Sequence, residues 1–222
     1  MDVQLRTRGA IAWDASGSGA TRDHAREFAL LDAYFQAMGN GEVTLAVLRD
    51  AAELPRTFSI RNGKWPALRE ALELLPYDGA TNLGAYRPSL GAEEVLLFSD
   101  GLHNYGESSW PAMAPRTYAI SAADKNAPVF LRQIAQKNGG HFVDLTVTPP
   151  REAAALLTRR STRLARVEGA GVNGLMIASP YGDGADGMAS AVGKIPVHGT
   201  TSLTAVVVDA EGREQRIAFD LP

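Results

Sequence analysis

The sequence predicts an α/β fold: a mostly parallel sheet flanked by helices, followed by a small antiparallel β segment. Short apolar runs that suit buried strands alternate with runs whose apolar residues recur at helical spacing, over about the first 160 residues. Because connections between parallel strands are right-handed, this alternation predicts a mostly parallel sheet. Beyond residue 160 the strand-like runs follow one another without helices between them, which indicates the antiparallel segment.

Composition excludes several classes of function. The chain has 222 residues, of which 45% are hydrophobic and 21% charged, so it can build a full core. Its net charge is −3 without a long basic run, which argues against electrostatic binding to nucleic acid or to an anionic membrane. It has no cysteine and no apolar run as long as a membrane span, so disulfides, thiolate metal sites and direct membrane insertion are not expected. The abrupt ends suggest a piece excised from a longer protein.

The first strand, at 11–13, is apolar on both faces and ends at Asp14. Thr21 is expected to cap the first helix, with Asp23 in its first turn, and apolar residues recur at helical spacing through 25–38. The remaining elements of this part are strands at 43–48, 56–60, 95–99, 117–120 and 141–145, helices at 64–75, 128–137 and 148–160, and a short helix or irregular turn at 86–90.

The remainder reads as β structure. Strands are predicted at 175–178, 192–197, 202–208 and 213–219, with a hairpin turn at 209–212. A β segment of about sixty residues is marginal as an independent core. We therefore expect one domain over residues 1–160 and, over 161–222, a β-rich segment that belongs to a larger flanking β domain.

A cluster of oxygen-bearing side chains follows the first strand. Asp14 stands at its carboxyl end, where open α/β sheets bind ligands. Ser16 and Ser18 follow at alternate positions, and Gly17 and Gly19 let the backbone turn tightly between them. One carboxylate and two hydroxyls that face one point form a hard-oxygen pocket, which suits Mg²⁺ or Ca²⁺.

Two distant stretches complete the pattern: the glycine-flanked loop 78–84 carries Thr81, and the strand at 95–99 is followed by Asp100 and Gly101. The set Asp-x-Ser-x-Ser, loop Thr and strand-Asp-Gly resembles the metal-ion-dependent adhesion site of von Willebrand factor type A domains. Carried over by motif, the ligands would be Asp14, Ser16, Ser18, Thr81 and Asp100. The family's usual Gly-Gly-Thr is Gly79-Ala80-Thr81 here, so the loop path is expected to shift slightly.

The resemblance implies a Rossmann-like, doubly wound sheet of six strands in the order 3-2-1-4-5-6, with one antiparallel edge strand. Asp14 and Asp100 would then face one crevice. It also implies a divalent ion, Mg²⁺ first and Mn²⁺ or Ca²⁺ as alternatives, with an open position for an acidic side chain of a partner protein. The expected function is a metal-dependent adhesion module and not an enzyme.

A second resemblance concerns the end of the chain. Val192-Gly193-Lys194 and the alternating run 202–208 resemble the β segment after the A domain in inter-α-trypsin inhibitor heavy chains and their bacterial relatives. Those proteins carry a VIT domain before the A domain and commonly lie outside the cytoplasm. This resemblance implies a larger VIT-containing parent protein in an extracytoplasmic compartment.

Other interpretations stay open. A metal-dependent hydrolase or phosphotransferase would need a base or nucleophile beside the ion, and the nearby candidates are Asp78, His103 and Glu107. Alternatively the protein is a scaffold, and the cluster of oxygen-bearing side chains is vestigial or only structural. Gly17-x-Gly19 also suggests a dinucleotide fingerprint, but Arg22 stands where the third small residue belongs.

His103 either shapes a partner contact or is an ordinary loop residue. Asn82 and Asp78 could replace Thr81 as a ligand.

Overall fold

A computed structural model describes residues 7–106, 109–111, 115–158, 163–169, 173–179, 190–194, 201–208 and 213–221. The chain divides into two compact units, Met1–Thr158 and Arg159–Pro222. Glu107 and the expected hairpin turn at 209–212 lie outside the described residues. Within the described part, no helix has the length and apolar character needed to cross a membrane.

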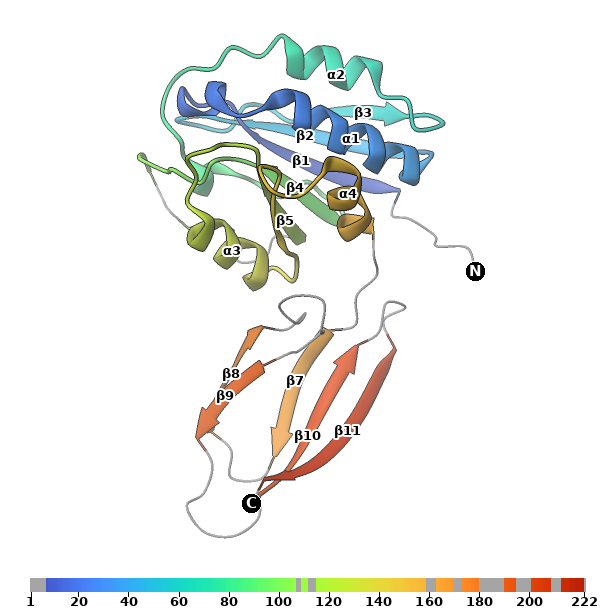
Figure 1. Ribbon diagram of the computed structural model, residues 1–222, viewed down its shortest axis with the longest axis vertical. Coiled ribbons are helices and arrows are strands. Elements are labelled where there is room, and N and C mark those ends of the chain that lie inside the picture. The colour runs from blue at the N-terminus through green and yellow to red at the C-terminus, as the bar shows by residue number, and fades with distance from the viewer. Residues whose placement is uncertain are drawn as a thin grey trace. The chain divides into compact units, whose positions relative to one another are not determined.

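The first unit contains a six-stranded sheet in the order β3-β2-β1-β4-β5-β6 (Figure 1). Its strands are β1 (Arg8–Asp14), β2 (Gly41–Leu48), β3 (Arg56–Ile60), β4 (Glu94–Phe98), β5 (Arg116–Ser121) and β6 (Phe142–Asp144). The edge strand β3 pairs antiparallel with β2, and the other neighbours are parallel. The predicted α/β class, strand order and antiparallel edge are confirmed.

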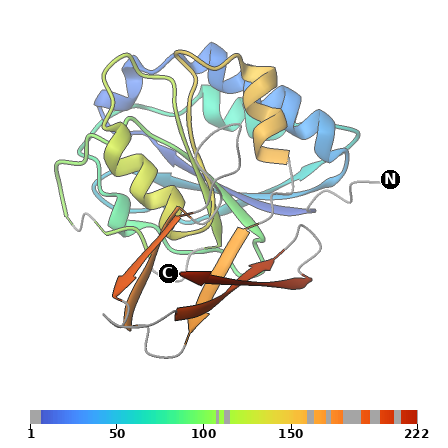
Figure 2. The same cartoon turned by 60° about the horizontal axis from the view of Figure 1, so that its bottom comes forward.

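Helices cover both faces of this sheet. They are α1 (His24–Met38), α2 (Pro66–Glu73), α3 (Pro128–Lys137) and α4 (Pro150–Thr158). Buried residues of α1, α2 and α4 share one core cluster, and those of α3 belong to a second cluster. Figure 2 shows α1 and α4 side by side. Strand β1 contributes to both clusters because successive side chains point to opposite faces, with Ile11 and Trp13 on the α1 face and Ala10 and Ala12 on the other.

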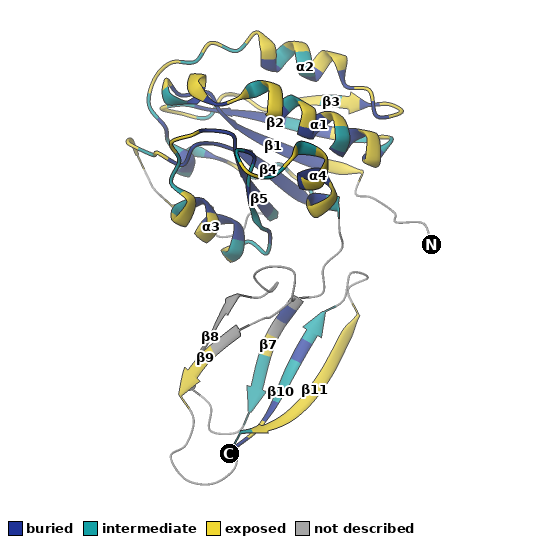
Figure 3. Cartoon of the chain, viewed as in Figure 1, coloured by how far each residue is buried: buried dark blue, intermediate teal, exposed yellow. Residues whose placement is uncertain are grey.

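The burial pattern confirms β1 as the centre of the sheet. From Gly9 to Asp14 every residue of β1 is buried, and β4 is buried along its whole length (Figure 3). In the doubly wound order, the connections from β1 lead to one side of the sheet and those from β4 to the other. The carboxyl ends of β1 and β4 therefore lie at the switch point, where this class of sheet binds ligands.

The predicted cap of α1 is wrong. The N-cap of α1 is Asp23, whose Oδ1 accepts a hydrogen bond from the Arg26 amide at 3.1 Å. Thr21 instead ends a 3₁₀ helix (Ser18–Thr21), where its hydroxyl donates to the Ser18 carbonyl at 2.8 Å. The stretch 86–90, expected as a short helix or irregular turn, is irregular, and a 3₁₀ turn precedes it at Leu83–Ala85. Residues that precede proline avoid the helical region, which explains why no helix continues toward Pro88.

The second unit is antiparallel, as predicted. One sheet has the order β11-β10-β7 and a two-stranded sheet pairs β8 with β9. The strands are β7 (Arg163–Gly169), β8 (Asn173–Ser179), β9 (Ser190–Lys194), β10 (Thr201–Val208) and β11 (Glu214–Leu221). Strand β7 was not predicted, because three of its seven residues are charged. The expected strand at 192–197 begins two residues earlier, and positions 195–197 lie outside the described residues.

Candidate metal centre

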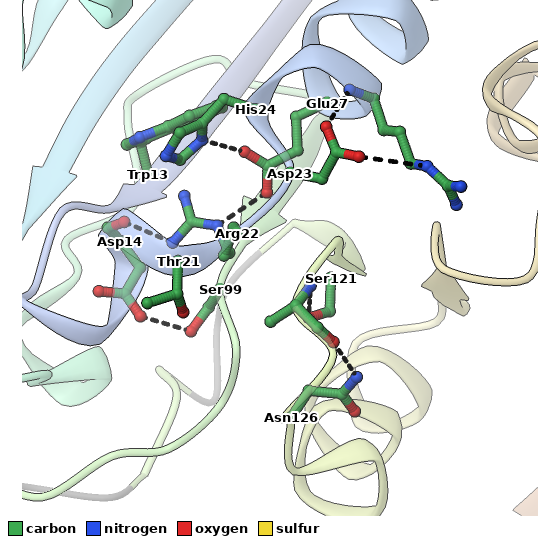
Figure 4. A network of polar contacts seen from close by, with 12 residues as sticks. Trp13, Asp14, Thr21, Arg22, Asp23, His24, Glu27, Ser99, Ser121 and Asn126 are labelled. Carbon is green, nitrogen blue, oxygen red and sulfur yellow. Dashed lines mark hydrogen bonds and ion pairs between the residues drawn. The ribbon is translucent and has the colours of Figure 1, made fainter.

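Asp14 is fixed by two hydrogen bonds at the carboxyl end of β1. Parallel pairing places Trp13 of β1 beside Phe98 of β4, so the next residues of the two strands are also neighbours. The Ser99 hydroxyl donates to Asp14 Oδ2 at 2.6 Å (Figure 4). The Ser16 amide donates to Asp14 Oδ1 at 3.0 Å. Asp14 is fully buried, so these bonds set the direction of its carboxylate and leave further lone pairs for another ligand.

The three predicted hydroxyl ligands form a chain of contacts. Thr81 Oγ1 donates to Ser16 Oγ at 2.8 Å, and Ser16 Oγ lies 3.3 Å from Ser18 Oγ. Ser16 and Thr81 are buried, and Ser18 is half-buried at the edge. The Thr81 loop therefore reaches the serine turn from 65 residues away.

Asp100 directly follows Ser99, which bonds Asp14. Its carboxylate accepts the Leu102 amide at 2.9 Å, and the Gly101 amide donates to the Ser99 hydroxyl at 2.9 Å. The Asp100 carbonyl accepts the Ala127 amide at 2.8 Å, which links the loop to the start of α3. Asp100 is buried beside Ser99, which bonds Asp14. Four of the five predicted ligands are thus connected by direct contacts. Asp100 follows Ser99 in the chain, and its carboxylate bonds the Leu102 amide.

The loop before Thr81 accommodates alanine in place of the family's second glycine. Gly79 has a φ of +71°, in the left-handed region that favours glycine, whereas Ala80 does not. A Cβ on Gly79 would also lie 2.4 Å from Asp50 Oδ1, so a side chain there has no room. Only the first position of the Gly-Ala-Thr segment needs glycine.

A buried ion pair supports Asp14 from the side of α1. The Arg22 guanidinium donates from Nη1 to the Asp14 carbonyl at 2.7 Å and from Nε to Glu27 Oε1 at 2.7 Å. Both side chains are completely buried, and the guanidinium lies 5.2 Å from the centre of the Trp13 ring (Figure 4). Burial alone would lower the pKa of Arg22, but Glu27 and Asp14 together raise it, so the group stays charged.

The packing of Arg22 also explains the Gly17-x-Gly19 pattern that suggests a dinucleotide site. A Cβ on Gly19 would lie 2.8 Å from both Arg22 Nη1 and the Asp14 carbonyl. Gly19 is therefore required where the turn packs against Arg22. The arginine that breaks the fingerprint is a buried structural residue at this position.

Aromatic and polar side chains pack around the buried Arg22–Glu27 pair. His24 Nδ1 lies 2.8 Å from Glu27 Oε2, and the His24 ring stacks on Trp13 and Tyr77. The Trp13 indole donates to the Tyr77 hydroxyl at 2.9 Å, and burial raises the pKa of Tyr77. The end of β1 is thus fixed by side chains of α1 and of the segment before Thr81.

The donor set suits a hard cation. Adjacent ligands of an octahedral Mg²⁺ lie about 3 Å apart, because each is about 2.1 Å from the ion. The hydroxyl separations of 2.8 and 3.3 Å match this spacing. Among the described residues, no group of three or more His, Asp or Glu side chains could hold a metal ion. The candidate site therefore depends on two carboxylates and three neutral hydroxyls, a set that favours magnesium, manganese or calcium over zinc.

The candidate bases of the enzymatic alternative have other contacts. The His103 ring packs against Phe130, with 5.4 Å between ring centres. Asp78 is exposed and pairs with Arg49 Nε at 2.9 Å.

Two residues of this site escaped sequence reasoning. Ser99 was read as the end of a strand, although its position before Asp100 on the neighbour of β1 could have indicated its role. Glu27 occupies an apolar face of α1, and a buried glutamate on such a face signals a buried cation.

No known family model matches the sequence, and no curated protein matches it. Solved structures do match. A von Willebrand factor type A protein from Catenulispora acidiphila aligns with 96% of this chain and 66% of its own, at 16% identity and a TM-score of 0.55. An aerotolerance-related membrane protein from Bacteroides fragilis aligns with 68% of this chain and 97% of its own, at 14% identity and a TM-score of 0.51. The more specific likeness to inter-α-trypsin inhibitor heavy chains and VIT-containing proteins stays a prediction. Its strand order and this structural similarity together show that the chain has a von Willebrand factor type A fold.

Proposed function

We propose that this chain is a protein-binding module whose adhesion site is a divalent ion held by oxygen ligands. The ligands are Asp14, Ser16, Ser18, Thr81 and Asp100. The observation that carries the proposal is the convergence of three hydroxyls at 2.8 and 3.3 Å beside the buried Asp14 carboxylate. These groups come from two segments that are far apart in the sequence, and they meet where this class of sheet binds ligands.

The ligand set explains why such a site would bind proteins. When bound, a magnesium ion with neutral hydroxyl ligands stays electrophilic and accepts a carboxylate oxygen from outside. Ser16 and Thr81 supply buried hydroxyls, Ser99 holds Asp14 in place, and Arg22 fixes the backbone at Asp14. The partner is expected to offer an acidic side chain. We further propose that the chain belongs to a larger VIT-containing protein.

Metal dependence is tested by thermal unfolding with and without Mg²⁺, Mn²⁺ or Ca²⁺. An ion at 100 times its dissociation constant should stabilise the wild type by about 2.7 kcal/mol. Thr81→Val keeps the shape of the side chain and removes one of the five candidate ligands, so the ion should bind more weakly and stabilise the protein less. Thr57→Val, on the exposed edge strand β3, is the matched control and should keep the full effect. A wild-type melting temperature that none of the three ions raises would refute the metal site.

The open position is tested with a small carboxylate. Acetate, as a stand-in for an acidic side chain, should displace water from protein-bound Mn²⁺ and lower the relaxation enhancement of water protons. If acetate has no effect on bound Mn²⁺, the adhesion mechanism is wrong even though the metal site exists. Turnover of a generic phosphate ester that depends on Mn²⁺ and on Asp14 would favour the hydrolase alternative.

A further inference from the structure

We propose that Asn104 is a positioning residue for Thr81: it joins the loop after β4 to the Thr81 loop and so sets where the Thr81 hydroxyl lies. The inference rests on the proposed function, because Thr81 is one of the five candidate ligands. Asn104 itself is exposed and is not a candidate ligand. Its proposed effect on metal binding is therefore indirect.

Both backbone polar groups of Thr81 contact this one residue. The Thr81 amide donates to Asn104 Oδ1 at 3.0 Å, and the Asn104 amide donates to the Thr81 carbonyl at 3.4 Å. The Thr81 hydroxyl meanwhile donates to Ser16 Oγ at 2.8 Å. A displacement of the Thr81 backbone would therefore move the hydroxyl relative to the serine turn.

Asp50, in the segment after β2, also holds the Thr81 loop. Asp50 Oδ1 accepts the Ala80 amide at 2.6 Å, and the Asp50 carbonyl accepts Asn82 Nδ2 at 2.9 Å. The loop is thus clamped between the segments that follow two different strands. Asp50 restrains the residues on either side of Thr81, and Asn104 restrains Thr81 itself.

A second contact joins the same two loops. Gly106 has a φ of +68°, and a Cβ at this position would lie 2.4 Å from Asn82 Nδ2. The chain after Asn104 therefore packs closely against the residue after Thr81. Because Asp100 begins this loop, one short segment supplies a candidate ligand and also positions another ligand from a different loop.

The first experiment measures Mn²⁺ affinity of the full chain by electron paramagnetic resonance. Asn104→Leu removes the acceptor at similar size and should weaken Mn²⁺ binding about tenfold, as is typical for outer-shell partners of metal ligands. Asn104→Asp keeps an acceptor and should bind at least as tightly as the wild type. Tyr105→Ala, at an exposed neighbour in the same loop, is the control and should not change the affinity.

A double-mutant cycle separates positioning from a general structural effect. If Asn104 acts only through Thr81, Asn104→Leu should change Mn²⁺ affinity less than about twofold once Thr81→Val is present. An equal loss in both backgrounds would overturn the proposal, since Asn104 would then act by another route. Unchanged affinity in Asn104→Leu alone would overturn it as well.

A metal-free measurement distinguishes this inference from the proposed function. Amide hydrogen exchange at Thr81, followed by NMR without metal, should be about tenfold faster in Asn104→Leu than in the wild type or Asn104→Asp, because the amide loses its acceptor. If the wild type binds no Mn²⁺, the metal site is refuted and this exchange rate alone decides whether Asn104 holds Thr81. An unchanged rate would refute the clamp whether or not metal binds.

Discussion

At the scale of single residues, the candidate site depends on hydroxyls that bond to one another and to a buried carboxylate. Ser99 shows the principle most clearly, because its hydroxyl donates to Asp14 Oδ2 and accepts the Gly101 amide. It is completely buried, so neither partner can turn to water if the hydroxyl is lost. Ser99 therefore orients a candidate ligand without being one.

Ser99→Ala should lower the free energy of unfolding by about 2 kcal/mol, because it removes hydrogen bonds from a buried carboxylate and a buried amide. Urea unfolding without metal measures this loss. Ser59→Ala, at an exposed position of β3, is the control and should stay within about 0.5 kcal/mol of the wild type. A Ser99 variant as stable as this control would show that the two bonds contribute little.

At the scale of elements, strand β1 is joined to helix α1 by a buried ion pair. Glu27 lies in the first turn of α1, and Arg22 precedes the helix and reaches back to the carbonyl of the last residue of β1. Removing one partner of a buried pair is costly, because the other charge stays in a medium that solvates it poorly. The pair therefore fixes how the helix meets the end of the strand.

Glu27→Gln should destabilise the protein by about 3 kcal/mol, since it leaves the Arg22 charge without its counter-ion. The matched control is Glu42→Gln, at an exposed position of β2, where little change is expected. Chemical denaturation of the two variants compares them directly. Equal stability of both would mean that the amide replaces the carboxylate as a partner of Arg22.

At the scale of the whole molecule, the large hydrophobic clusters formed by the described residues lie in the first unit. These two clusters lie between Ala10 and Leu157. In the second unit, β11 is exposed along almost its whole length (Figure 3). Its exposed cross-strand contacts include Arg166 with Glu214 at 2.8 Å, and such surface ion pairs contribute little to stability.

A fragment of residues 1–158 should therefore fold alone and keep any metal-dependent stabilisation. Far-UV circular dichroism and a thermal melt with and without Mg²⁺ test this. The complementary fragment, 159–222, should lack a cooperative transition, because a core of this size is marginal. An unfolded 1–158 fragment would show that the first unit needs the second.

Alkaline unfolding should reveal a tyrosine in the core. Burial raises the pKa of Tyr86 to about 12, and its ring stacks on Trp110 with 4.5 Å between ring centres. An unfolded tyrosine ionises near pH 10, so between about pH 10 and 12 the unfolded chain loses a proton that the folded chain keeps. Stability present below pH 10 is thus lost as the pH rises.

The effect of Tyr86 is isolated by comparison with Tyr86→Phe. Between pH 9 and 12, the wild type should lose about 2–3 kcal/mol more stability than the variant. Urea unfolding at a series of pH values measures the difference, and other titrating groups cancel in it. Parallel pH profiles would show that Tyr86 ionises normally in the folded protein.

Pattern along the chain was enough to predict the order of most elements and the part of the candidate site that lies in one turn. Hydrophobic periodicity distinguishes buried strands from amphipathic helices because it reports which faces leave water. Asp14, Ser16 and Ser18 could be grouped because they are adjacent in one turn. The likeness to a known motif then assigned Thr81 and Asp100, and the structure places Thr81 against Ser16.

How the candidate ligands are held depends on contacts between distant segments, which the folded chain alone reveals. Ser99 bonds Asp14 across 85 residues, and Asn104 bonds Thr81 across 23. Thr21 and Asp23 are both good capping residues, and the choice between them followed from how the preceding turn packs. Such contacts leave no periodic trace in the sequence, because they depend on which loops the finished sheet brings together. Local pattern therefore predicted the elements, while long-range hydrogen bonds determined the geometry of the site.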